Sequence, residues 1–108
     1  MRGIHIKTQD AQTTGNGTAY QLDSRCRNLT FYIRGTGTVS AGAVQIEHAH
    51  DKDYTGTWQP IGTPITVVSG EVDAVQLTGA FGAVRSRIST NIAGGGSVTV
   101  DLFGNSGE

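Results

Sequence analysis

The residues best placed to do chemistry lie in one short segment, residues 48–53, which reads His-Ala-His-Asp-Lys-Asp. In an extended strand His48 and His50 project to the same face, and Asp51 begins the polar turn that follows. Two imidazoles and a carboxylate form a ligand set that zinc or iron accepts. A metal site is therefore one hypothesis. The alternative, which we favour, is a solvated strand end that runs into an acidic turn.

The other patterns associated with catalysis are incomplete, and we predict that the protein is not an enzyme. No serine stands in a G-x-S-x-G elbow. The Gly-rich stretches at 35–37 and 94–96 lie between strand patterns, whereas a phosphate-binding loop needs a helix behind it. The single cysteine, Cys26, cannot form a disulfide within the chain and has no base placed beside it. We assign no catalytic residue and no cofactor.

Strand alternation places several aromatic and arginine side chains on outer surfaces, and this indicates binding to a protein partner. Exposed aromatic rings beside arginine are typical anchors of protein interfaces. Two alternatives stay open: the arginines could lie on a solvated sheet face balanced by Glu47 and Asp101, and Trp58 could be a core residue. The predicted interface residues are Ile4, Ile6, Tyr32, Tyr54, Trp58, Arg85 and Arg87.

Composition narrows the function classes. The net charge is −1, so nothing marks the chain as a binder of the nucleic-acid backbone. No apolar run approaches the roughly 18–20 residues that span a bilayer, and residues 1–5 lack the apolar core of a signal peptide. We expect neither nucleic-acid nor membrane partners, and synthesis in a cytoplasm.

The elements that must position these side chains are strands, because apolar residues recur every second position and no helical period is present. Leu29, Phe31 and Ile33 are expected to face inward, with Tyr32 and Arg34 facing out. The clearest pattern predicts one inward row in a late strand, made of Val84, Ser86, Ile88, Thr90 and Ile92. The 16 glycines are expected to mark turns between short strands.

Some expectations concern strand ends and irregularities. Residues 1–8 are expected to form an N-terminal arm and residues 105–108 a frayed tail. Residues 10–18 are predicted to be a loop and residues 61–64 a corner. Gly42, inside a strand pattern, predicts a bulge or bend.

Together these patterns predict a single all-β domain over residues 1–108, built from about eight to nine short antiparallel strands. Uneven strand lengths favour a β-sandwich over a barrel. Strand order cannot be obtained from periodicity, so jelly-roll and immunoglobulin-like topologies both stay open.

Three segments resemble a recurring pattern of short β-sandwich proteins encoded among the structural genes of tailed bacteriophages. They are residues 35–42 (GTGTVSAG), 57–62 (TWQPIG) and 81–89 (FGAVRSRIS), and the likeness extends over about residues 35–104. The pattern joins a corner of the form W-x-x-I-G to a strand with R-x-R-I, then a Gly-rich hairpin and a closing V-T-V strand. These positions serve the fold, so no binding residue is transferred from the family.

The resemblance implies a head decoration (cement) protein that binds and stabilises the capsid exterior of a virion, with the major capsid protein as its partner. It also implies a homo-oligomer, and a trimer would suit closed symmetry about a capsid axis. One alternative is a tail, baseplate or fibre accessory protein. Another is a carbohydrate-binding module that uses Trp58 and Tyr54 to stack on sugars.

Overall fold

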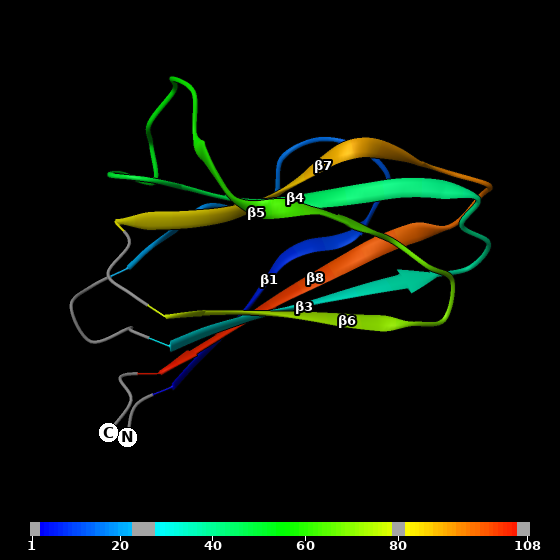
Figure 1. The fold of residues 1–108 in the computed structure, drawn as a ribbon, viewed down its shortest axis with the longest axis horizontal. Coiled ribbons are helices and arrows are strands. Elements are labelled where there is room, and N and C mark those ends of the chain that lie inside the picture. Colours follow the sequence, from blue (N-terminus) through cyan, green and yellow to red (C-terminus); the bar gives the residue numbers. More distant parts are fainter. Residues whose placement is uncertain (1–2, 23–27, 79–81, 106–108) are drawn as a thin grey trace.

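The computed structural model describes residues 3–22, 28–78 and 82–105, which form two four-stranded antiparallel sheets packed face to face (Figure 1). Sheet A has the strand order β1-β8-β3-β6, and sheet B has the order β2-β7-β4-β5. No helix able to cross a membrane occurs in these residues. The strands are β1 (Gly3–Gln12), β2 (Tyr20–Gln21), β3 (Asn28–Thr36), β4 (Ala41–Ala49), β5 (Gln59–Thr66), β6 (Val72–Thr78), β7 (Ala83–Ala93) and β8 (Ser97–Asn105).

The strand order resolves the topology left open by the sequence. β1 pairs with β8 and β3 with β6 in sheet A, whereas β2 pairs with β7 and β4 with β5 in sheet B. The strand pairs, taken from the two ends of the chain inward, therefore fall alternately in sheet A and in sheet B. This is the winding of a jelly roll, and it confirms the predicted β-sandwich.

The core lies between the sheets and comes from the inward rows of the central strands. Leu29, Phe31 and Ile33 of β3 are 1%, 0% and 1% exposed, as the alternation predicts. Facing them in sheet B are the buried side chains of β4 and β7. The other buried apolar residues are Leu22, Val44, Ile46, Trp58, Val67, Ala83, Val84, Ile88, Ile92, Val98, Val100 and Leu102.

β1 is longer and more irregular than expected. Residues 3–12 pair with β8, so residues 3–8 form a strand of the protein's own sheet and not a free arm, and residues 10–12 are not loop. The register with β8 shifts between Lys7 and Gln9. This bulge lets two successive side chains, Thr8 and Gln9, both turn inward, where they are 2% and 1% exposed.

Two other irregularities correct the sequence-based expectations. Residues 61–64 are not a corner between two strands but lie inside β5, where Gly62 takes a left-handed φ of 70°. In β7 the predicted inward row is interrupted at Thr90, which is exposed, and resumes at Ile92, which is buried. The β4–β7 register shifts on both sides of Ala43, and such shifts break the alternation.

Gly42 lies at this irregular point of β4, as predicted. Its φ is 151°, and an added Cβ would lie 2.3 Å from Cδ1 of Ile92 on the neighbouring strand. Glycine is therefore required here by both backbone conformation and close approach.

Candidate functional site

The outer surface of sheet A carries a group of exposed aromatic and apolar side chains. Tyr32 of β3 is 38% exposed, Phe103 of β8 is 41% exposed and Val72 of β6 is 57% exposed. Phe103 stacks on the ring of His5 at a centroid distance of 4.1 Å and meets Tyr32 edge-to-face at 5.4 Å. A row of three rings thus crosses β1, β8 and β3.

A charged group lies next to these rings on the same surface. The Asp101 side chain, only 10% exposed, accepts a hydrogen bond from Arg34 at 2.9 Å and lies 3.3 Å from Nε2 of His5. The Arg34 side chain is 42% exposed. Asp101 therefore holds the arginine beside the aromatic rings while part of the guanidinium group stays open to a partner.

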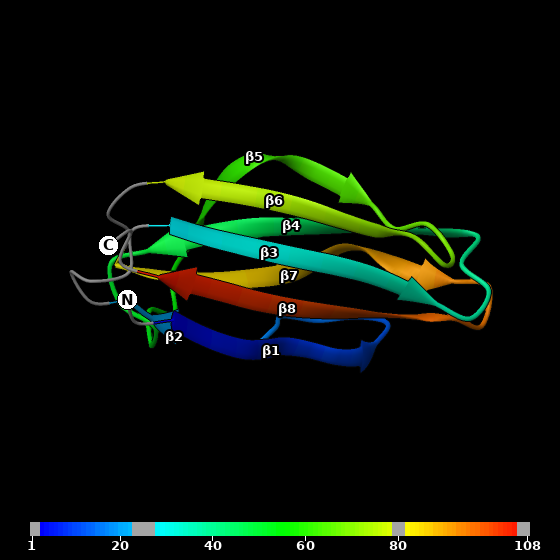
Figure 2. The ribbon, with the colours of Figure 1, turned by 90° about the horizontal axis from the view of Figure 1, so that it is seen from below.

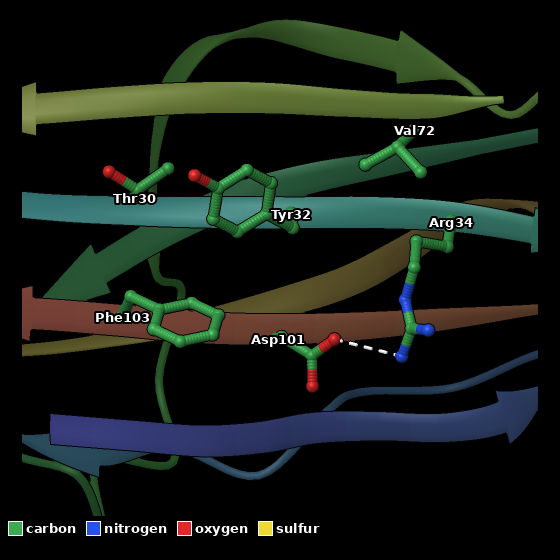
Figure 3. Close-up of a pocket in the computed structure, with 6 residues that line it drawn as sticks. All are labelled: Thr30, Tyr32, Arg34, Val72, Asp101 and Phe103. Carbon is green, nitrogen blue, oxygen red and sulfur yellow. Dashed lines mark hydrogen bonds and ion pairs between the residues drawn. The ribbon is translucent and has the colours of Figure 1, made fainter.

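Five of these side chains, together with Thr30, line a surface hollow of about 520 Å³, shown in Figure 3. Tyr32 and Phe103 lie side by side at one end, and Arg34 points toward Asp101 at the other. The lining residues are Thr30, Tyr32, Arg34, Val72, Asp101 and Phe103. We call this set, with His5, the aromatic face.

The register of sheet A explains why residues so far apart in the chain meet here. Outward residues of β3 lie opposite outward residues of both neighbours: Tyr32 pairs with Asp101 of β8 and with Ala74 of β6. The face depends on strand order, so only Tyr32 and the outward direction of Arg34 could be predicted from alternation.

The arginines of sheet B are arranged differently. Glu47 of β4, whose side chain is 7% exposed, accepts hydrogen bonds at 2.9 Å from Nε of both Arg85 and Arg87. Arg85 also covers the Trp58 ring at 4.4 Å from its centroid. Of the two carboxylates expected to balance the arginines, Glu47 pairs with Arg85 and Arg87, whereas Asp101 pairs with Arg34 on sheet A.

Trp58 is a buried residue and does not present its ring to a partner. It is 3% exposed, and its indole N–H donates a hydrogen bond to the Tyr54 carbonyl oxygen at 3.0 Å. The loop from residue 50 to 58 folds back and places the ring beneath Arg85. A tryptophan in this position is unsuitable as a platform for stacking on sugars.

The segment around His48 and His50 does not assemble a metal site within the described residues. No group of three His, Cys, Asp or Glu side chains comes together there or elsewhere in the described part of the chain. His48 lies at the end of β4, while the His50 ring packs at 5.0 Å from the Tyr54 ring. Asp51 accepts a hydrogen bond from the Asp53 amide, which is a turn geometry. A smaller hollow of about 330 Å³ lies over this loop.

The predicted interface residues are thus divided among several surfaces. Tyr32 belongs to the aromatic face, Tyr54 lies exposed on the loop before β5, and Ile6 is half-buried opposite Leu102. The Ile4 side chain and Cys26 lie outside the described residues. His5, Val72, Asp101 and Phe103 are added to the candidate site by the structure.

Comparison with known proteins supports the fold and not an activity. No protein-family model and no curated protein matches the chain. The SPBc2 prophage-derived protein YomS is similar in structure, with 17% sequence identity, a TM-score of 0.64 and coverage of 95% of this chain and 92% of YomS. A structure of Bacillus endospore appendages, which form disulfide-linked pili, has 16% identity, a TM-score of 0.49 and coverage of 97% and 85%. The likeness to YomS shows a shared fold, and the second likeness is too distant to support an inference.

Proposed function

We propose that this chain is a non-enzymatic structural protein of a bacteriophage particle, and specifically a head decoration protein that binds the outer surface of the capsid. The observation that carries the proposal is the aromatic face, where Tyr32, Phe103 and Val72 stay exposed beside Arg34. Isolated apolar residues are common on protein surfaces, but a cluster of rings beside an arginine is typical of interface anchors.

Two further observations support the assignment of this chain to a bacteriophage particle. The segments at residues 35–42, 57–62 and 81–89 resemble sandwich proteins of tailed phages, and a protein of prophage origin shares the fold along nearly the whole chain. Jelly rolls are frequent in viral capsid domains, although a fold alone does not determine a function. A module that binds only the assembled shell stabilises it by its binding free energy, and engagement of several capsid subunits strengthens the effect.

Cosedimentation with purified phage heads that lack the protein tests this proposal, followed by heating of those heads. We expect binding at a saturating copy number compatible with capsid symmetry, and a higher temperature of head rupture. If the protein stays in the supernatant with heads but sediments with tails, the decoration role is wrong and the tail accessory role is supported.

The aromatic face is tested with a matched pair of tyrosines. Tyr32 and Tyr54 are each 38% exposed, but only Tyr32 lies on this face. We expect Tyr32→Ala to weaken head binding by at least about tenfold and Tyr54→Ala to leave it unchanged. The reverse result would move the interface to the loop before β5.

A further inference from the structure

The outer strands of the two sheets are β1, β6, β2 and β5, and all but β6 are poorly suited to accept another strand along the outer edge. β2 has only two residues, and the neighbouring edge of β7 is occupied by residues 13–17 through hydrogen bonds such as Ile88 N–H to the Gly15 carbonyl. β5 contains Pro60, Pro64 and a left-handed Gly62. Prolines cannot donate a backbone hydrogen bond, and edge strands are commonly protected in this way.

β1 is protected by its irregular backbone. Its register shifts twice against β8, and Ala11 adopts a positive φ of 49°. Bulges twist an edge away from a flat incoming strand. Lys7 also lies on this strand and is exposed.

β6 is different from the other three. Its seven residues pair with β3 in an unbroken register from Val72 to Thr78, with no proline, no lysine and no left-handed residue. No described strand pairs with its outer edge, and Figure 2 shows β6 along the margin of sheet A. Its one charged residue is Asp73. A flat, regular, nearly uncharged edge of this kind is the type that accepts a further strand.

The direction of the free hydrogen-bonding groups follows from the β3–β6 ladder. Both backbone groups of Gly35, which follows the last paired residue of β3, point toward the β6 side, because its N–H donates to the Glu71 carbonyl oxygen at 3.4 Å and its carbonyl oxygen accepts from the Gly70 N–H at 3.0 Å. Hydrogen-bonded and non-bonded pairs alternate along antiparallel strands. The backbone groups of alternate residues in β6 therefore point away from β3, and these residues are Val72, Ala74, Gln76 and Thr78.

We propose that β6 pairs with β6 of a second copy, antiparallel about a two-fold axis at Val75. This register joins all seven residues of each strand and places outward-bonding residues opposite one another, Val72 with Thr78 and Ala74 with Gln76. About eight backbone hydrogen bonds then form across the axis. Asp73 lies opposite Leu77 of the second copy, so no like charges meet.

The protected edges explain why the partner strand is another β6. A head-to-tail trimer would need β6 to add to a different edge of the next copy, and the edges of β1, β2 and β5 are unsuitable. An edge that is complementary only to itself closes as a two-fold dimer. A dimer therefore replaces the trimer suggested by the family resemblance. Pairing of this kind does not depend on what the aromatic face binds.

Pairing through β6 would also cover apolar side chains at the open side of the sandwich. Val75 and Leu77 of β6, with Ile61 and Ile65 of β5, pack against the core but remain only partly buried. A second copy at the β6 edge brings Val75 against Val75 and adds Leu77 nearby. The gain in apolar burial at this side favours the dimer.

Sedimentation equilibrium of the full chain over roughly 1 μM to 1 mM tests the proposal with a charge-reversal pair. Ala74 and Gln76 are exposed, so lysines there are compatible with the folded monomer. In the double variant Ala74→Lys with Gln76→Lys, each new lysine lies opposite a lysine of the second copy. These two like-charge pairs should raise the dissociation constant of the dimer by roughly 2- to 30-fold. Ala74→Lys with Gln76→Glu places opposite charges there and should restore it. Thr63→Lys with Thr66→Lys, on the exposed side of β5, is the matched control and should dimerise normally.

Circular dichroism establishes that each variant is folded before its association is compared. A wild-type chain that remains monomeric at the highest concentration overturns the proposal. So does an equal loss in the β5 control, or a failure of the lysine–glutamate variant to recover association.

Discussion

Replacing Glu47 by glutamine should destabilise the fold much more than removal of an exposed carboxylate. The Glu47 side chain is 7% exposed and accepts one hydrogen bond from each of two arginines. Arg85 is 17% exposed and lies over the buried Trp58 ring, whereas Arg87 is 39% exposed. Glutamine keeps the shape of the side chain but removes the charge that both guanidinium groups face.

The size of the effect is set mainly by Arg85. Removing one partner of a buried ion pair costs about 3–5 kcal/mol, because the remaining charge stays buried and uncompensated. Solvent screens the more exposed Arg87, so its pair contributes less. The glutamine amide oxygen still accepts one hydrogen bond. We therefore expect Glu47→Gln to lower the free energy of unfolding by about 3 kcal/mol and Tm by roughly 15 °C.

Urea unfolding followed by the fluorescence of Trp58, the one tryptophan of the chain, measures this change directly. Asp53→Asn is the matched control, because its side chain is 80% exposed and its ion pair with Lys52 is open to solvent. We expect this control to change Tm by no more than about 2 °C. Equal effects of the two carboxylate-to-amide changes would show that Glu47 does not stabilise the arginine pair as inferred.

Three other changes test the interior. Ser86→Ala removes the hydroxyl that donates to Gln9 at 2.9 Å and should cost about 1–2 kcal/mol in urea unfolding; no loss would mean that the buried contact is unimportant. Gly17→Ala places a Cβ 2.6 Å from the Ser86 hydroxyl oxygen and 2.7 Å from the Thr8 carbonyl oxygen, so thermal unfolding should show a loss of about 1–3 kcal/mol; an unchanged Tm would contradict this close approach. Phe31→Ala removes a core side chain that is 0% exposed and leaves a cavity, so it should lower the free energy of unfolding by about 3–5 kcal/mol in the same measurement.

The inward rows of the central strands could be predicted because alternation is a local property. In β3 every second residue from Leu29 to Ile33 is buried, and each conclusion needed only the neighbouring residues. The same reasoning placed Tyr32 outside. It could not supply the strand order, because jelly-roll and immunoglobulin-like sandwiches share the same alternation.

The failures occur where one strand depends on the register of another. Thr8 and Gln9 look like one inward and one outward residue, but a bulge against β8 turns both inward to meet Ser86. Thr90 lies at a comparable shift between β4 and β7. The polar composition of residues 10–12 suggested a loop, yet pairing with β8 keeps them extended as far as Gln12.

The aromatic face could be predicted only in part, for a related reason. Tyr32, Phe103 and His5 come from three strands, and they meet because β8 lies between β1 and β3. Alternation gives each side chain a direction but does not say which strands are neighbours. Histidine and phenylalanine at opposite ends of the chain carried no signal of contact.

Residue type alone also does not distinguish an exposed aromatic residue that anchors an interface from a buried one that stabilises the fold. Trp58 with Arg85 and Tyr32 with Arg34 look equivalent in sequence, as aromatic and arginine residues on outward strand positions. On sheet B the loop before β5 folds the indole under the guanidinium group, and Glu47 neutralises the charge, so the contacts are satisfied within the chain. On sheet A no such loop covers the rings in the described residues, and Tyr32 keeps 38% of its surface exposed. This difference in internal satisfaction is the physical reason for placing partner binding on sheet A, the sheet that also carries the regular edge of β6.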